Sequence, residues 1–350
     1  MSLGPLMVDV EGLALDAEDR ELLRHPLIGG VILFSRNYQS REQLMQLVKD
    51  LHEVRQPRLI VAVDHEGGPV QRFREDFTHL PAASQLGELY QHDASQALRL
   101  TREVGWLLAA ELLVCGIDLS FAPVLDIEKN DSQVLRHRCY HSDPQIVAEM
   151  AHQLMAGMNA AGMQATGKHF PGHGGVVGDS HQELPVDTRS YEDIYAQDIL
   201  PFERMIHYGL AGIMPAHVVY SQVDKDPAGF STFWLQEVLR KRLQFSGVIF
   251  SDDLSMAGAQ MVGGYVQRAK AALAAGCDVL LVCNNRQGVT EILEDLQARA
   301  NPVLQTRIAR LHGKPARELK NLRASPMWKK TVAAIRLLHD EYPLEQELNF

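Results

Sequence analysis

An aspartate and a histidine two residues apart, Asp179 and His181, lie in the glycine-rich segment 171–190. Residues at this spacing project to the same side of an extended loop. An Asp–His pair can exchange protons with a substrate, because the carboxylate fixes the imidazole tautomer and stabilises the imidazolium. The alternative interpretation is a local hydrogen bond that only holds the loop together. No helix or strand pattern is evident in this segment, and loops of this length inside a compact domain are usually functional or mobile.

Two adjacent carboxylates, Asp252 and Asp253, end an apolar run. A carboxylate at such a place could be a covalent nucleophile or an acid–base group. Neighbouring residues of a strand point to opposite faces, so we expect only one of the two to face a site. Asp64 ends another apolar run and is either a ligand-binding residue or a buried structural hydrogen-bonding group.

Basic and imidazole groups follow similar runs. Lys168 and His169 lie in the sequence Gly-Lys-His-Phe-Pro-Gly-His-Gly-Gly, and His217 ends a further run. Arg72 and Arg74 are either surface charges, or one of them enters the site. Several of these groups could also be donors to a metal ion: His169, His173, His181, His217 and Asp252. Their spacing matches no common metal signature, so a metal-dependent hydrolase stays open only as an alternative.

The elements that must position these groups are eight short apolar runs, typical of buried parallel strands. They are predicted at Leu6–Val10, Gly30–Phe34, Leu59–Asp64, Leu119–Asp126, Gln164–Phe170, Gly212–His217, Val248–Asp252 and Val279–Asn284. Amphipathic stretches separate them. Eight such alternations predict an α/β fold, a single (β/α)8 barrel of the TIM type. An open doubly wound sheet is the rival, but no Gly-x-Gly-x-x-Gly follows the first run.

Polar residues follow the predicted strands, where the active site of a (β/α)8 barrel lies. They are Asp9, Ser35–Asn37, Asp64–Gly68, Asp126, Lys168 and His169, His217, Ser251–Asp253, and Asn284 and Asn285. Together they predict a pocket rich in donors and acceptors at the C-terminal ends of the strands. Such a pocket suits a polyhydroxylated or charged ligand.

Several residues predict where helices begin and end. Ser40 followed by Gln43 predicts a capping box, and Pro144 with Gly162 brackets another helix. Pro201 should kink or split the helix predicted over Tyr191–Tyr208. We expect one catalytic domain over residues 1–350, with the barrel at about 5–300 and a helical extension at about 301–350, packed on the barrel exterior.

Composition narrows the class of protein. The net charge of −10 argues against a general nucleic-acid binder, which needs a basic footprint. No run approaches the ~18 apolar residues of a membrane span, and the N-terminus lacks the features of a secretory signal. No CxxC pair occurs among the cysteines Cys115, Cys139, Cys277 and Cys283, which are interpreted as buried free thiols. We therefore expect a cytoplasmic protein with no membrane partner.

Three motifs resemble glycoside hydrolase family 3: Val63–Gly68 followed by Arg72, Gly167–Gly174, and Ile249–Met256. Within that family, Lys-His-Phe-Pro-Gly-His-Gly together with Asp-Ser-His is similar to the bacterial cytoplasmic β-N-acetylglucosaminidases of peptidoglycan recycling. The resemblance covers residues 4–290.

The resemblance implies a role for each matching residue. Asp252 would be the nucleophile that forms a covalent glycosyl-enzyme. His181 would be the general acid and then the base, with Asp179 as its partner. The sugar would be bound by Asp64, Arg72, Arg138, Lys168 and His169, with His217 nearby. Most retaining glycosidases use two carboxylates, so a His–Asp pair departs from the common pattern.

The implied activity is a retaining exo-β-N-acetylglucosaminidase without a cofactor or metal. Its expected substrate is N-acetylglucosamine (GlcNAc) linked to 1,6-anhydro-N-acetylmuramic acid, with or without a peptide. The enzyme is expected to be a monomer or a weak homo-oligomer. A glycoside phosphorylase, a metal-dependent hydrolase and a non-catalytic sugar-binding barrel are the alternatives. His65, Pro69 and Cys139 replace the glutamine, arginine and serine common in the family, which puts affinity and loop shape in question.

Overall fold

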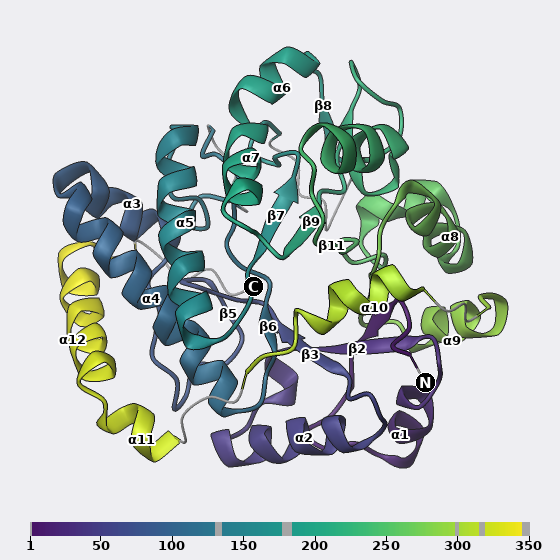
Figure 1. The fold of residues 1–350 in the computed structure, drawn as a ribbon, viewed down its shortest axis with the longest axis horizontal. Helices are drawn as coiled ribbons and strands as arrows, with labels where there is room; N and C mark the ends of the chain where they lie inside the picture. The colour runs from purple at the N-terminus through teal and green to yellow at the C-terminus, as the bar shows by residue number, and fades with distance from the viewer. Residues whose placement is uncertain (1, 130–134, 177–183, 298–300, 315–318, 345–350) are drawn as a thin grey trace.

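The computed structural model describes residues 2–129, 135–176, 184–297, 301–314 and 319–344. Two parallel sheets lie at the centre, with helices packed around them (Figure 1). The first sheet has the order β12 (Leu280–Val282), β1 (Leu6–Val8), β2 (Ile28–Leu33), β3 (Ile60–Val63), β6 (Leu119–Ser120). The second has the order β11 (Val248–Ile249), β9 (Gly212–Pro215), β7 (Thr166–Phe170). Each predicted run overlaps one of these strands, and the α/β class is confirmed.

The two sheets are joined at both edges by isolated parallel bridges. Val124, just beyond β6, pairs with Lys168 of β7, and Phe250, just beyond β11, pairs with Val279 next to β12. Since all the pairings of the two sheets and these bridges are parallel, the C-terminal strand ends lie at one end of the molecule. Polar residues that follow different strands are therefore brought together there.

Two small sheets lie outside this arrangement. The antiparallel pair β4 (His65–Gly67) and β5 (Val70–Gln71) forms a hairpin directly after β3. The parallel pair β8 (Val186–Asp187) and β10 (Val219–Tyr220) includes part of the segment 171–190. The expectation that this segment has no strand was wrong, because β8 obtains its backbone partners from a distant part of the chain.

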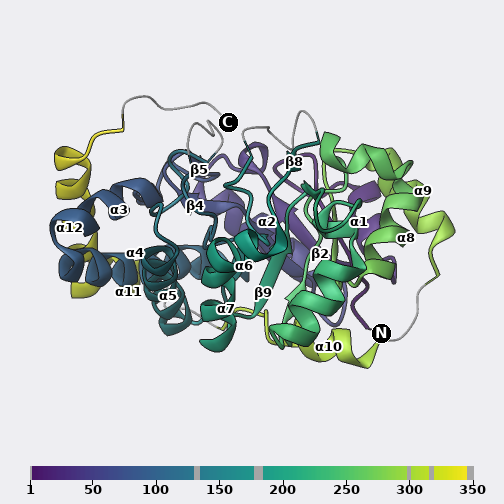
Figure 2. The same ribbon diagram turned by 90° about the horizontal axis from the view of Figure 1, so that it is seen from above.

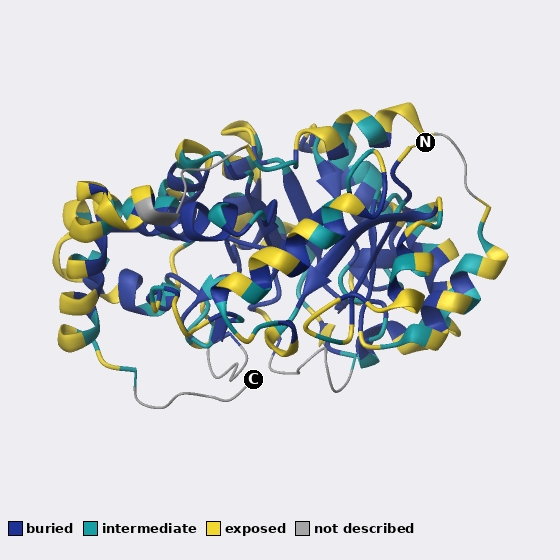
Figure 3. Ribbon diagram, turned by 90° about the horizontal axis from the view of Figure 1, so that it is seen from below, coloured by how far each residue is buried: buried dark blue, intermediate teal, exposed yellow. Residues whose placement is uncertain are grey.

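The helices surround the strands and are exposed on their outer faces (Figures 2 and 3). The α-helices are α1 (Ala17–Leu23), α2 (Arg41–Glu53), α3 (Ala83–His92), α4 (Ala94–Val114), α5 (Pro144–Ala161), α6 (Tyr191–Gln197), α7 (Ile199–His207), α8 (Tyr265–Ala275), α9 (Arg286–Asp295), α10 (Pro302–Ala309), α11 (Leu319–Ala324) and α12 (Pro326–Glu341). A wider π-type helix, η3, spans Phe233–Arg242, and short 3-10 turns are η1 (Ser35–Asn37), η2 (Ala228–Phe230) and η4 (Ala257–Val262). No helix in the described ranges is long and apolar enough to span a bilayer.

Most predicted helix boundaries are confirmed. The Ser40 hydroxyl accepts a hydrogen bond from the backbone N–H of Gln43 at the start of α2. The reciprocal half of the capping box is absent there, since the Gln43 side chain accepts from the N–H of Gln39 instead. Helix α5 begins at Pro144, ends at Ala161 and is capped by Gly162, whose φ of 107° is a left-handed conformation that favours glycine.

The helix predicted over Tyr191–Tyr208 is split, but at Asp198 and not at Pro201. A proline ring clashes with the carbonyl group four residues earlier, which is that of Gln197. Helix α6 therefore ends at Gln197, and Pro201 lies in the first turn of α7. The carboxylate of Asp198 at the break is fully buried and is paired with Lys129 and Arg189.

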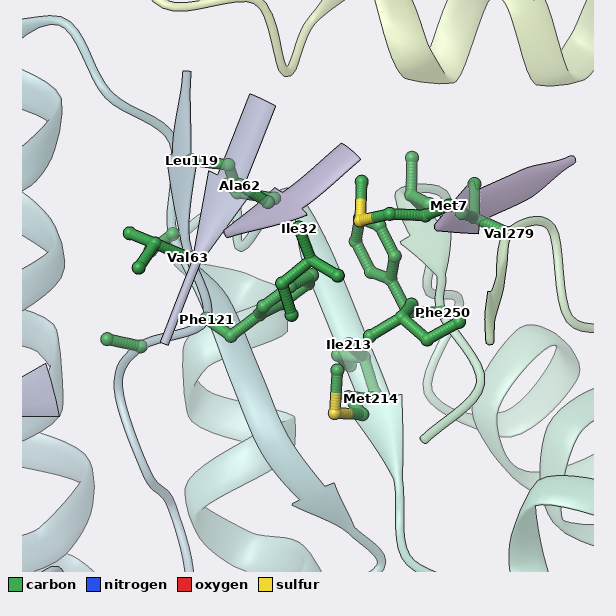
Figure 4. Packing of buried hydrophobic residues seen from close by; sticks show 14 of the residues in the cluster. Met7, Ile32, Ala62, Val63, Leu119, Phe121, Ile213, Met214, Phe250 and Val279 are labelled. Atoms are coloured by element: carbon green, nitrogen blue, oxygen red, sulfur yellow. The ribbon is translucent and has the colours of Figure 1, made fainter. Parts of the chain in front are cut away.

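The hydrophobic core fills the space between the two sheets (Figure 4). Phe121, just after β6, meets Phe250, just after β11, edge to face, with ring centroids 5.2 Å apart. Met7, Ile32, Ala62 and Ile213 are other buried members of this core (Figure 4). Cys115, Cys139, Cys277 and Cys283 are buried free thiols, as predicted.

The C-terminal helix α12 packs against α4 and α3 (Figure 1). The indole N–H of Trp328 in α12 donates to the carboxylate of Glu111 in α4 at 2.9 Å. Glu111 is nearly inaccessible and also accepts from the backbone and hydroxyl groups of Thr78. These bonds tie α12 to the loop that follows β5.

Candidate active site

A cavity of about 390 Å³ opens where the C-terminal ends of the strands meet, the place predicted from sequence. Among the described residues, its polar lining comprises Asp64, Glu66, Arg72, Arg138, Lys168, His169, His173, Asp252, Asp253 and Asn284. Apolar groups such as Ile32, Phe34 and Met214 also line it. Six predicted site residues are thus brought together: Asp64, Arg72, Arg138, Lys168, His169 and Asp252.

A chain of ion pairs crosses one wall of the cavity. Lys168 Nζ lies 2.8 Å from Asp64 Oδ1 and 2.6 Å from Glu66 Oε1. Arg138 binds both carboxylate oxygens of Glu66 through Nε and Nη2, each at 2.8 Å. Arg72 Nη2 lies 3.7 Å from Asp64 Oδ2. This network fixes the directions of three cations around the space that a ligand would fill.

The network keeps its carboxylates ionised. Burial would raise the pKa of Glu66, but Arg138 and Lys168 outweigh it and hold that pKa at about 2. Burial is likewise outweighed at Asp64, where Lys168 and Arg72 lower the pKa. Sequence analysis identified Asp64 but assigned no role to Glu66. Its position two residues after Asp64 is the available signal, because residues at this spacing in an extended segment project to the same side.

A bulge in β7 explains how the adjacent residues Lys168 and His169 both reach the cavity. Lys168 pairs with Met214 of β9, whereas Phe170 pairs with Pro215, so His169 is an extra residue. Such an insertion interrupts the alternation of side chains between the two faces of a sheet.

The His169 ring is held by Asp126, which is fully buried. His169 Nδ1 lies 2.7 Å from Asp126 Oδ2, and Asp126 Oδ1 accepts from the backbone N–H groups of His169 and His173. Burial raises the pKa of the Asp126 carboxyl, but His169 outweighs burial, and the pKa is lowered to about 2. The sequence pattern predicted that Asp126 lies at a polar strand end, but it did not indicate that His169 and His173 are its partners.

Asp252 and Asp253 both line the cavity, so the expectation that only one of them faces it was wrong. Strand β11 ends at Ile249, and the alternation of a strand no longer applies three residues later. The backbone N–H of Asp253 donates to Asp252 Oδ1 at 2.8 Å. The Asp253 carboxylate accepts from Ser255 and from the backbone N–H of Cys283. Burial raises the pKa of Asp253 to about 6 despite these bonds.

His217 lies behind this pair of aspartates and is not among the described residues that line the cavity. It is fully buried, its Nε2 donates to the carbonyl oxygen of Asp253 at 3.1 Å, and its ring stacks on Phe230. Burial lowers the pKa of His217. In this structure it supports the segment that carries Asp252.

The other residues singled out in the sequence have different outcomes. Arg72 enters the cavity, whereas Arg74 donates to the carbonyl of Gly68. His65 packs against Phe73 and Phe77, away from the cavity, and burial lowers its pKa to about 3. Asp179 and His181 lie outside the described residues. Within the described ranges, no group of three or more His, Cys, Asp or Glu side chains has the geometry of a metal site.

Comparisons with known proteins identify the relatives of this chain. The family model described as "Glycosyl hydrolase family 3 N terminal domain" matches residues 5–312. A β-hexosaminidase of Thioalkalivibrio sulfidiphilus is 54% identical over 348 residues, which are 99% of this chain and 100% of that protein. A β-hexosaminidase of Nitrosospira multiformis is 51% identical over 348 residues, 98% of this chain and 100% of that protein.

Solved structures give the same result. Native NagZ from Neisseria gonorrhoeae superimposes with a TM-score of 0.91 and 44% identity, covering 97% of this chain and 98% of that one. The same protein in complex with N-trifluoroacetyl-D-glucosamine gives a TM-score of 0.92 and 43% identity, with the same coverage. The sequence matches extend over nearly the whole chain, and the cavity is rich in charged and polar groups. The chain therefore belongs to glycosyl hydrolase family 3, as an enzyme of the β-hexosaminidase type.

Proposed function

We propose that this enzyme is a retaining exo-β-N-acetylglucosaminidase that acts through a covalent glycosyl-enzyme on Asp252. The observation that carries the proposal is the cavity, in which the Asp252 carboxylate shares an enclosed space with Asp64, Arg72, Arg138, Lys168 and His169. The volume suits a small ligand with many hydroxyl groups. The complex of the Neisseria gonorrhoeae relative with a glucosamine derivative supports this ligand class.

In the proposed first step, an Asp252 carboxylate oxygen attacks the anomeric carbon while the bond to the leaving group breaks. His181 donates a proton to the departing oxygen, and Asp179 stabilises the imidazolium from which it comes. In the second step, His181 removes a proton from water, which attacks the anomeric carbon and releases Asp252. The two displacements together retain the β configuration.

The family resemblance supports GlcNAc-1,6-anhydro-N-acetylmuramic acid, with or without a peptide, as the substrate. We place the reaction in cytoplasmic peptidoglycan recycling, a location that suits four buried free thiols. We also propose that the two sheets form one closed (β/α)8 barrel. The bridges Val124–Lys168 and Phe250–Val279 support closure, since they connect the sheets at both edges.

A trapping experiment tests the proposed chemistry. The fluorine of a 5-fluoro GlcNAc analogue slows both displacements, while a good leaving group keeps the first fast enough for the covalent intermediate to accumulate. We expect one adduct per protein molecule by intact mass, mapped by peptide sequencing to Asp252. The absence of an adduct, with ordinary substrate still hydrolysed, would contradict a covalent intermediate. Formation of GlcNAc-1-phosphate in phosphate buffer would instead indicate the phosphorylase alternative.

His181→Ala is expected to slow hydrolysis most for substrates with poor leaving groups. Aryl glycosides with acidic phenols leave without full protonation, whereas a sugar leaving group needs a general acid. The test compares kcat/KM over a series of aryl GlcNAc glycosides, with the exposed His207→Ala in α7 as a control. An equal loss across the series would argue against the acid role of His181.

A further inference from the structure

A second Asp–His pair, Asp126 with His169, lies beside the cavity. Asp126 is fully buried, and its carboxylate is not in the described lining of the cavity. His169, by contrast, lines the cavity together with Lys168. Asp126 can therefore affect a bound sugar only through the groups that it holds.

The hydrogen bonds of Asp126 hold the backbone at His169 and His173 and the imidazole ring of His169. Oδ1 accepts from the backbone N–H of His169 at 3.2 Å and from that of His173 at 2.7 Å. Oδ2 lies 2.7 Å from Nδ1 of His169. Since an ionised carboxylate only accepts, Nδ1 of His169 must carry the proton in this contact.

This contact determines which ring atom can serve a ligand. With Nδ1 committed to Asp126, Nε2 is the nitrogen of His169 that remains for the cavity. We infer that Asp126 is a positioning residue, which fixes the His169 tautomer and ring direction so that Nε2 contacts a sugar hydroxyl. The inference rests on the proposed function in one respect, that the sugar occupies this cavity.

The substitution Asp126→Asn tests the inference because it keeps the shape and changes the hydrogen bonding. The asparagine oxygen can still accept from the two backbone N–H groups, while its amide N–H₂ group then faces Nδ1. That arrangement favours the other tautomer, with the proton on Nε2. Asp118→Asn is a matched control. Asp118 directly precedes β6, whereas Asp126 follows it, and both side chains are buried. Asp118 is paired with Arg58 and not with a histidine of the cavity.

Two measurements separate this role from a general structural one. Nitrogen-15 NMR of labelled histidines should show Nδ1–H for His169 in the wild type and Nε2–H in Asp126→Asn. With p-nitrophenyl N-acetyl-β-D-glucosaminide, Asp126→Asn should raise KM by about 10- to 100-fold, the range seen for loss of comparable supporting partners. Asp118→Asn should lower thermal stability but leave KM and the His169 signals unchanged.

Several outcomes would overturn the inference. The first is a wild-type His169 that carries its proton on Nε2, a result that needs no variant to fold. The second is an Asp126→Asn enzyme whose KM equals that of Asp118→Asn. A switched tautomer with unchanged KM would refute the contact between His169 and sugar, while the Asp252 adduct would still report on the proposed reaction.

Discussion

Asp252→Asn is expected to lower kcat for a GlcNAc glycoside by roughly 10⁴-fold or more, the range seen when a catalytic nucleophile is removed. The neutral amide keeps the size of the carboxylate but is a poor nucleophile toward the anomeric carbon. The ion pairs of Lys168 and Arg138 do not involve Asp252, so the variant should still bind GlcNAc. Steady-state kinetics and calorimetric titration with GlcNAc measure the two effects separately.

The control is a carboxylate at the same end of the fold that is expected to take no part in the reaction. Asp9, which follows β1, pairs with Arg36 and is not among the described residues that line the cavity. Asp9→Asn should therefore cost far less activity than Asp252→Asn. A complementary variant, Asp252→Ala, leaves space for azide and should form an α-glycosyl azide. Normal turnover by Asp252→Asn would require the nucleophile assignment to be withdrawn.

The location of the site could be predicted from sequence because it follows from strand order and polarity. Parallel strands bring their C-terminal ends together, so polar residues after separate apolar runs must meet. Asp64, Lys168 and Asp252 come from three such runs and line one cavity. The location of the site is predictable because each strand can be identified from its own short apolar run.

The pairing of the charged groups could not be predicted in the same way. Arg138 and Glu66 are 72 residues apart, and Asp126 and His169 are 43 residues apart. Their distances depend on how loops and a bulge are placed after the strands have assembled. For the same reason the prediction for Asp252 and Asp253 was wrong, since it extended strand geometry beyond Ile249, where β11 ends.

Glu66→Gln is expected to destabilise the protein by about 3–5 kcal/mol, the cost of removing one partner of a buried ion pair and leaving the other charge uncompensated. The side chains of Glu66, Arg138 and Lys168 are 7%, 10% and 4% exposed. Water therefore cannot solvate the two cations once the carboxylate charge is removed. Glutamine also turns an N–H₂ donor toward one of the two cations. Urea unfolding at pH 7 measures the loss, and KM should rise because Arg138 and Lys168 lose their common anchor.

An exposed ion pair is the control for this substitution. Glu237 and Lys241 pair across one turn of η3, with side chains 45% and 67% exposed. Pairs of this kind contribute about 0.3–0.5 kcal/mol, so Glu237→Gln should change stability by no more than that. Equal losses of stability in Glu66→Gln and Glu237→Gln would show that the buried network contributes no more than surface charge.

The pH dependence gives a second test of the same network. The pKa of Glu66 falls from its ordinary value of 4.5 to about 2 on folding, so folding favours its ionised form. The resulting stability is fully present above about pH 4.5 and is lost as the pH falls towards 2. The stability difference between wild type and Glu66→Gln should therefore shrink over that interval. A difference that stayed constant from pH 5 to pH 2 would mean that shape and not charge holds Arg138 and Lys168 in place.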